Sequence, residues 1–222
     1  MKKLFAGVVL FFLCMVVFTG CTAPKVSILG DSYSTFRGSV PEGNAIWYPN
    51  NRNDVRQVEN CWWYQVIEAI DGQLEKNESY SGSTICNTGY GKRDAAKFSF
   101  VTRLIRLGDP DIILICGATN DSWAGSPIGE YKWAGWTEND LFSFRPAMAK
   151  MLSDIKQLYP GAEVFFILND KLKPVINESV HEICRYYKVQ CIDLQQIDKQ
   201  SGHPSVKGMK AMADQVLEAI SR

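Results

Sequence analysis

The chain contains 222 residues, of which 46% are hydrophobic and 22% are charged, and its formal net charge is zero. This composition is ordinary for a globular protein, and the balanced charge gives no reason to expect a nucleic acid or an acidic partner. About two hundred residues are the size of one domain, and the sequence has no internal repeat or low-complexity linker that would indicate a second.

Residues 1–20 begin with basic residues, continue as an apolar run and end in small residues, which is typical of a secretory signal. Phe18 to Cys21 resembles a bacterial lipobox, which implies that Cys21 becomes the lipidated first residue of the mature chain. Residues 21–25 would then form a short tether before a domain over 26–222. The acyl chains would anchor the protein to the membrane of the bacterial cell envelope, at the outer membrane or cell surface. The alternatives are a plain signal peptide with an incidental cysteine and an uncleaved anchor.

A short apolar run begins at Val26 and stops at Gly30-Asp31-Ser32. It predicts a buried parallel strand whose carboxyl end presents Ser32 where open α/β folds bind their ligands. Ser32 is therefore the candidate nucleophile, and its N–H can point at a developing oxyanion. An isolated Gly-Asp-Ser is more often only a turn, so this interpretation needs partners elsewhere in the chain.

The rest of the chain alternates predicted strands and helices. Residues 39–60 are rich in Pro, Gly and Asn, which is typical of a loop. Apolar runs predict a weak strand before Ser81-Gly82 and further strands over 112–116, 164–168 and 189–194. Helical spacing predicts helices over 61–70, 92–107, 139–159, 174–187 and 205–220, with Ser205 capping the last. Strands joined by helical crossovers form a parallel sheet with helices on both faces.

Gly82 follows the second strand, Asn120 follows the third, and His203 precedes the last helix. Together with Gly30-Asp31-Ser32, these blocks resemble, in order, those of the SGNH (GDSL-type) hydrolase family of esterases and lipases, from Val26 to the C-terminus. The resemblance implies a flavodoxin-like three-layer α/β/α sandwich with a five-stranded parallel sheet in the order 2-1-3-4-5. It also implies Ser32 as nucleophile, His203 as base, and an oxyanion hole formed by Ser32, Gly82 and Asn120.

The sequence departs from the family at the acid of the triad. The family usually has an aspartate three residues before the histidine, whereas this chain has Gln200 there and Asp198 two residues earlier. A glutamine cannot stabilise an imidazolium by charge. Three arrangements remain open: Asp198 turns in, a neutral acceptor such as a carbonyl orients a Ser32–His203 dyad, or the site is impaired.

Other polar residues have simpler interpretations. We expect Asp31 and Asp121 to accept backbone N–H groups in turns, and His181 to be a structural residue of its helix. The sequence has no Walker loop, zinc-binding histidine pattern or dinucleotide fingerprint, so it predicts no cofactor and no metal. The cysteines have no metal-knuckle spacing, although an oxidising compartment would allow a disulfide between Cys184 and Cys191.

The long connection over residues 122–144 contains Trp123, Trp133 and Trp136, which are the candidate substrate-binding residues, and the loop after the first strand adds Trp47 and Tyr48. Exposed indoles offer flat faces to sugar rings, although they also fill small cores under loops. The expected function is hydrolysis of acyl esters, mainly acetyl esters, on carbohydrate at the cell envelope. The alternatives are a lysophospholipase or thioesterase, and a non-catalytic glycan-binding lipoprotein of the same fold.

Overall fold

The computed structural model describes residues 22–221, so the predicted signal and the lipidation site Cys21 lie outside the described residues. Its centre is a five-stranded sheet in the order β2-β1-β3-β4-β5, with every neighbouring pair parallel. This order confirms the predicted flavodoxin-like topology. The strands are β1 (Lys25–Gly30), β2 (Gln73–Asn77), β3 (Ile112–Gly117), β4 (Glu163–Leu168) and β5 (Gln190–Asp193).

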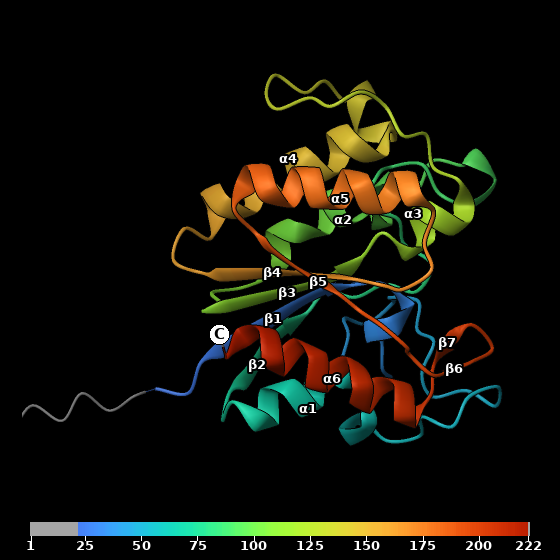
Figure 1. Cartoon of the computed structure of the whole chain (residues 1–222), viewed down its shortest axis with the longest axis vertical. Coiled ribbons are helices and arrows are strands. Elements are labelled where there is room, and N and C mark those ends of the chain that lie inside the picture. Colours follow the sequence, from blue (N-terminus) through green and yellow to red (C-terminus); the bar gives the residue numbers. More distant parts are fainter. Residues whose placement is uncertain (1–21, 222) are drawn as a thin grey trace, which may run out of the picture.

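Helices cover both faces of the sheet (Figure 1). One face carries α1 (Trp62–Ala69) and α6 (Val206–Ile220). The other carries α2 (Phe100–Arg103), α4 (Phe144–Leu158) and α5 (Pro174–Tyr187). Because successive strand residues point to opposite faces, Ile28 enters the core under α1 and α6 whereas Leu29 enters the core under α4 and α5. The sheet is therefore buried on both sides, as its apolar strands require.

The predicted helices 61–70, 174–187 and 205–220 are confirmed with small changes at their ends. Ser205 caps α6 as expected, since its hydroxyl accepts a hydrogen bond from the Gly208 N–H at 3.1 Å. Within residues 22–221, no helix has the length and apolar character needed to cross a membrane.

The single helix predicted over 92–107 is wrong. The segment forms three short 3-10 turns, η3 (Tyr90–Lys92), η4 (Ala96–Phe98) and η5 (Leu104–Arg106), with the one-turn helix α2 between the last two. The reason is competition for backbone donors, because the N–H of Phe100 donates to Thr84 O at 3.0 Å rather than to a helical partner. The helix predicted over 139–159 is likewise divided, since extended Ser143 separates η6 (Asn139–Phe142) from α4.

Four short elements at the carboxyl edge of the sheet escaped prediction. They are the 3-10 turn η1 (Ser32–Ser34), the helix α3 (Thr119–Ala124), and the strands β6 (Lys199–Gln200) and β7 (His203–Pro204), which form an antiparallel hairpin. A further 3-10 turn, η2 (Val58–Asn60), precedes α1. Since β1 and β3 are neighbours, η1 and α3 leave the sheet side by side.

Candidate active site

Ser32 and His203 lie in hydrogen-bond contact at the carboxyl edge of the sheet. The Ser32 Oγ lies 2.9 Å from His203 Nε2, although the two residues are 171 positions apart in the chain. Ser32 begins η1 directly after β1, and Asp31 caps this turn by accepting the Tyr33 N–H at 3.0 Å. The neighbouring hydroxyl of Ser34 instead accepts the indole N–H of Trp62 at 3.2 Å. The hydroxyl in contact with His203 is therefore that of Ser32, and the hydroxyl of Ser34 is bonded to Trp62 instead.

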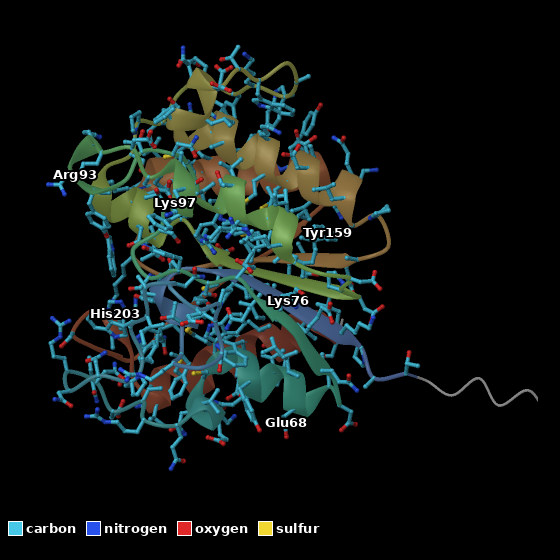
Figure 2. The ribbon with its side chains drawn as sticks, turned by 180° about the vertical axis from the view of Figure 1, so that it is seen from behind. Glu68, Lys76, Arg93, Lys97, Tyr159 and His203 are labelled. Carbon is cyan, nitrogen blue, oxygen red and sulfur yellow. The ribbon has the colours of Figure 1, made fainter. Side chains whose placement is uncertain are left out.

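The β6–β7 hairpin brings His203 back over the end of β1. Ser201 and Gly202 form its turn with φ values of 51° and 77°, the left-handed conformation that two-residue hairpin turns require. Two tyrosines hold the hairpin down, since the hydroxyl of Tyr33 donates to Gly202 O at 2.8 Å and that of Tyr48 donates to Pro204 O at 2.9 Å. Figure 2 shows His203 near the same end of the molecule as Arg93 and far from Tyr159.

The far nitrogen of His203 faces a backbone carbonyl. Its Nδ1 lies 3.1 Å from the Ser201 carbonyl oxygen. Because a carbonyl can only accept, Nδ1 carries the proton, and Nε2 is left as the acceptor for the Ser32 hydroxyl. Of the three arrangements that the sequence left open, this geometry matches the neutral acceptor.

Neither candidate acid contacts the imidazole. The Asp198 carboxylate accepts a hydrogen bond from the Ser205 hydroxyl at the start of α6. Gln200 is exposed, and it lies opposite His203 in the hairpin. The alternative in which Asp198 turns in toward His203 is therefore wrong for this structure, because that carboxylate supports the cap of α6 instead.

Aromatic rings surround the imidazole. Trp47 stacks on it with ring centroids 3.6 Å apart and planes 10° apart, and Tyr33, Tyr48 and Trp123 lie around it at centroid distances of 5.4, 6.3 and 6.3 Å. Burial lowers the pKa of His203 to about 4, against a smaller raising effect of the hydrogen bond to Ser201. The positive charge of Arg52 adds to the lowering. The sequence placed Trp47 in a loop, but no spacing linked it to His203.

Asn120, one of the residues predicted to bind an oxyanion, is hydrogen-bonded to the loop that contains Gly82. Asn120 Nδ2 donates to Ser83 O at 2.9 Å, and Asn120 Oδ1 accepts the hydroxyl of Tyr90 at 2.8 Å, so both neighbours fix the orientation of the amide. Gly82 adopts φ 83°, which glycine tolerates without strain. Within residues 22–221, the N–H groups of Ser32 and Gly82 donate to no protein acceptor. Neither N–H group therefore has a protein acceptor that would compete with an oxyanion, and the oxyanion hole stays a prediction.

A fully buried arginine, Arg103, links the end of β1 to the loop that contains Gly82. Arg103 Nη2 donates to Gly30 O at 3.1 Å and to the Ser83 hydroxyl at 2.8 Å. It thereby joins the end of β1 to the loop that contains Gly82 and that accepts the Asn120 amide. Burial lowers the pKa of Arg103 to about 9, while nearby Glu78 and Asp31 oppose the change. No sequence signal distinguishes Arg103 from the exposed basic residues around it.

Asp31 and Asp121 are turn carboxylates, as predicted. The two oxygens of Asp121 accept the N–H groups of Ile85 and Cys86 at 2.8 and 3.3 Å. Burial raises the pKa of Asp31 to about 7 and that of Asp121 to about 6, although backbone hydrogen bonds act in the opposite direction. Neither carboxylate contacts His203 or the Ser32 hydroxyl.

Only one of the three predicted substrate-binding tryptophans lies beside the Ser32–His203 pair. Trp123 packs its ring edge against Tyr33 and is 45% exposed. The prediction is wrong for Trp133, which stacks on Tyr186 near the end of α5, at the opposite edge of the sheet. It is also wrong for Trp136, whose ring lies under the Lys150 ammonium of α4. Both rings are partly buried against the core that α4 and α5 share, so their apolar surface serves packing there.

Residues 24–220 match the family model of the GDSL-like lipases/acylhydrolases. The chain is 50% identical to a protein of Bacteroides ovatus described as a GDSL-like lipase, covering 90% of this chain and 99% of that one, with a TM-score of 0.89. It is 54% identical to a similarly described protein of Bacteroides uniformis, covering 90% and 96% of the two chains, with a TM-score of 0.88. None of the curated proteins matches it.

More distant structures share the fold. A family two carbohydrate esterase from Clostridium thermocellum, solved in complex with cellohexaose, is 16% identical and has a TM-score of 0.61, over 89% of this chain and 63% of that one. At this identity the likeness concerns the fold.

Proposed function

Because the chain belongs to the GDSL-like lipase/acylhydrolase family and is thus an ester hydrolase, we propose that Ser32 is its nucleophile and His203 its general base. The observation that carries this proposal is the 2.9 Å contact between Ser32 Oγ and His203 Nε2. A serine hydroxyl is a weak nucleophile at neutral pH, so an adjacent base within hydrogen-bond reach is what the chemistry requires.

In the proposed reaction, Ser32 Oγ bonds to the acyl carbon while its proton passes to His203 Nε2. The negative charge on the former carbonyl oxygen is stabilised by the N–H groups of Ser32 and Gly82 and by the Asn120 amide. The Nε2 proton then passes to the leaving oxygen as the ester bond breaks. A water molecule repeats the sequence on the acyl-enzyme, which releases the acid and restores the Ser32 hydroxyl.

We assign the orienting role of the usual acid to the Ser201 carbonyl. It fixes the reactive tautomer of His203 through the 3.1 Å contact with Nδ1. As a neutral group it stabilises the imidazolium less than a carboxylate does. The site therefore works as a Ser32–His203 dyad, in which Trp47 stacked on the imidazole adds a cation–π contribution when the ring becomes charged.

The proposed substrate class is acyl esters, mainly acetyl esters, of carbohydrate. The exposed ring of Trp123 beside the dyad supports a sugar-binding role. The similar fold of the carbohydrate esterase bound to cellohexaose agrees with this class. A lysophospholipase or thioesterase is the enzymatic alternative, and a glycan-binding protein without turnover is the alternative that the absent acid favours.

Hydrolysis of p-nitrophenyl acetate and of acetylated xylo-oligosaccharides tests the proposal. We expect Ser32→Ala to abolish turnover and Ser34→Ala, the matched control, to retain it if the fold is preserved. Release of acetate from the oligosaccharide with a kcat/KM well above that for lysophospholipid or acyl thioester would support the carbohydrate substrate. Binding of the oligosaccharide by a wild-type protein that hydrolyses no ester would favour the glycan-binding alternative.

We also propose that Cys21 carries a lipid anchor that holds the enzyme at the cell envelope. The support is the apolar run that ends at Gly20-Cys21. Labelled fatty acid should be incorporated by the wild-type chain and not by Cys21→Ser, which should leave the membrane fraction. Wild-type protein found free of lipid, with its N-terminus cut at another residue, would contradict the proposal.

A further inference from the structure

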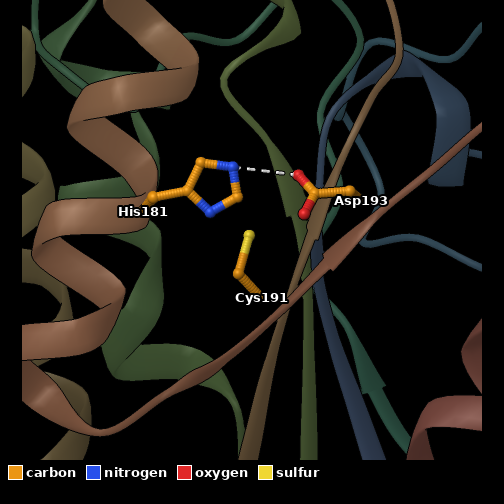
Figure 3. Close-up of side chains that lie close together, drawn as sticks. All are labelled: His181, Cys191 and Asp193. Atoms are coloured by element: carbon orange, nitrogen blue, oxygen red, sulfur yellow. Dashed lines mark ion pairs between the residues drawn. The ribbon is translucent and has the colours of Figure 1, made fainter.

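Three metal-ligating side chains of different types converge on the edge strand β5, away from Ser32 and His203. Figure 3 shows His181 of α5 facing Cys191 and Asp193 of β5. One ligand atom of each residue lies within 4.8 Å of the others, and His181 Nε2 is 3.1 Å from Asp193 Oδ1. The arrangement follows from the fold, because residues i and i+2 of a strand point to the same face and α5 packs on that face.

We infer that His181, Cys191 and Asp193 form a binding site for a divalent transition-metal ion, with Zn²⁺ as the best-fitting ion. Imidazole nitrogen, thiolate sulfur and carboxylate oxygen are the three ligand types that zinc takes in proteins. Two ligands about 2.1 Å from a tetrahedral ion lie about 3.4 Å apart, close to the observed separation of the His181 and Asp193 atoms.

The surroundings leave room for the small adjustments that binding requires. The side chains of His181 and Asp193 are 41% and 51% exposed, so both can rotate toward an ion. Cys191 is partly buried against the core under α5. Because the His181 and Asp193 side chains are open to solvent, a water molecule can supply the fourth ligand. The ion would replace the Cys191 thiol proton, which passes to solvent as the metal–sulfur bond forms.

A metal ion at this site would stabilise the edge strand β5. β5 is the last strand in the sheet order, and an edge strand lacks a partner on one side. A metal ion held by one residue of α5 and two of β5 would cross-link this strand to the helix above it. The expected role is therefore stabilisation of the fold, independent of ester hydrolysis.

The main competitor is oxidation. Cys184, three residues after His181 on α5, is buried beside Cys191, and both cysteines are free in the structure. A disulfide between them, which an oxidising compartment would allow, would remove the Cys191 thiolate. Metal binding is therefore measured on the full chain after reduction with a phosphine, with the free thiols counted first.

The test is titration of the reduced, metal-free protein with Co²⁺, followed by displacement with Zn²⁺. We expect one Co²⁺ per chain with a thiolate-to-metal absorption band, and a melting temperature raised by about 5–10 °C when free Zn²⁺ is a hundredfold above its Kd. Cys191→Ser should abolish the absorption band, and both Cys191→Ser and Asp193→Asn should weaken binding by roughly a hundredfold or more.

Three control variants separate this site from other sources of binding. Cys184→Ser removes the disulfide partner but keeps all three ligands, so it should bind normally. Asp109→Asn changes an exposed carboxylate elsewhere, and His203→Ala removes the other histidine of the chain; both should also bind normally. The inference is overturned if the reduced wild-type chain binds no Co²⁺ or Zn²⁺, or if folded Cys191→Ser and Asp193→Asn bind as tightly as wild type.

Discussion

The imidazole of His203 combines an unusually low proton affinity with a neutral orienting partner. Burial disfavours its charged form, and the Ser201 carbonyl dipole and the stacked Trp47 ring oppose this only in part. The same ring must nevertheless accept the Ser32 proton during each turnover. His203 is therefore a weaker base than an ordinary histidine, but it stays neutral, and so able to accept a proton, at acidic pH.

The lowered pKa of His203 predicts an enzyme that stays active at acidic pH. Only neutral His203 can act as base, and its pKa is lowered to about 4, so the neutral form persists as the pH falls to about that value. We expect the acid limb of kcat/KM for p-nitrophenyl acetate to have its midpoint near pH 4 instead of the ordinary value near 6.5. A pH–rate profile of the wild-type enzyme measures it. A midpoint at pH 6 or above would show that burial does not dominate the environment of the ring.

Gln200 allows the charge of the missing acid to be restored. It lies opposite His203 in the hairpin, where facing side chains share one side. The substitution Gln200→Asp would place a carboxylate near the imidazole and favour the imidazolium, which raises the pKa of His203. We therefore expect the acid limb of the pH–rate profile to move to higher pH and kcat near pH 8 to increase.

Asp198→Asn is the matched control for this change. Because the Asp198 carboxylate bonds the Ser205 hydroxyl and not His203, its loss should lower the stability of the start of α6 and leave the acid limb in place. A fall in kcat of several orders of magnitude in folded Asp198→Asn would instead return Asp198 to the role of triad acid.

Among the structural elements, the end of β1 and the loop of residues 79–83 are held together by Arg103. Gly30 O accepts both the Tyr80 N–H at 3.1 Å and Arg103 Nη2 at 3.1 Å. The second bond of Nη2, to Ser83, extends the link to the loop whose carbonyl accepts the Asn120 amide. Small movements of one part would therefore displace the others.

We predict that Arg103→Met lowers kcat by about a hundredfold or more with a small change in KM, since the donors to the oxyanion would lose their alignment. Removing a buried charge that donates to two carbonyls and a hydroxyl should also lower the free energy of unfolding by about 3–5 kcal/mol. Arg106→Met, an exposed arginine three residues on, serves as the control. Steady-state kinetics with urea denaturation measures both effects, and an unchanged kcat in folded Arg103→Met would remove it from the alignment of the site.

The regular elements were predictable from sequence because periodicity and local caps determine them. Ser205 caps a helix with its hydroxyl, and Pro174 favours the first position of a helix through its fixed φ. The apolar runs of the strands can be recognised from the local sequence alone. The segment 92–107 has helical periodicity but breaks, because Phe100 and its neighbour donate to the 84–85 backbone. That competition depends on tertiary contact, and no local pattern records it.

The candidate site likewise contains residues that the sequence could predict and residues whose placement needed the structure. Ser32, Gly82, Asn120 and His203 were found from short blocks that resemble a family. Trp47 over the imidazole and the Ser201 carbonyl behind it depend on how a hairpin and a distant loop meet, so their placement required the structure. Trp133 and Trp136 show the opposite failure, since proximity in sequence to Trp123 did not bring their rings into contact with His203, and they pack against α5 and α4 instead.

At the scale of the whole molecule, buried titratable groups near the carboxyl edge of the sheet couple folding to pH, and Asp31, Asp121 and His203 are the main ones. Burial raises the pKa of Asp31 to about 7 and that of Asp121 to about 6, from an ordinary value of 3.8. Their contribution to stability is present below pH 4 and is lost as the pH rises through 6 and 7. His203 acts in the opposite sense, since its pKa is lowered to about 4 and its contribution is lost as the pH falls from 6.5 toward that value.

Asp31 and Asp121 therefore oppose the imidazole between pH 4 and 6, and Glu78, whose pKa is also raised by burial, acts in the same sense as the two aspartates. Above pH 6.5 the change in stability is dominated by Asp31. We predict that the free energy of unfolding, measured by urea denaturation, falls between pH 5 and pH 8. Asp31→Asn keeps an oxygen for the Tyr33 N–H but cannot ionise, so it should flatten this dependence and be relatively more stable at pH 8.

Asp140→Asn is the control, because hydrogen bonds from Lys132 and Thr137 lower the pKa of Asp140 to about 2, outside the measured range. A wild-type stability that rises from pH 5 to pH 8, or an Asp31→Asn curve parallel to wild type, would mean that Asp31 stays ionised beside Arg103 throughout.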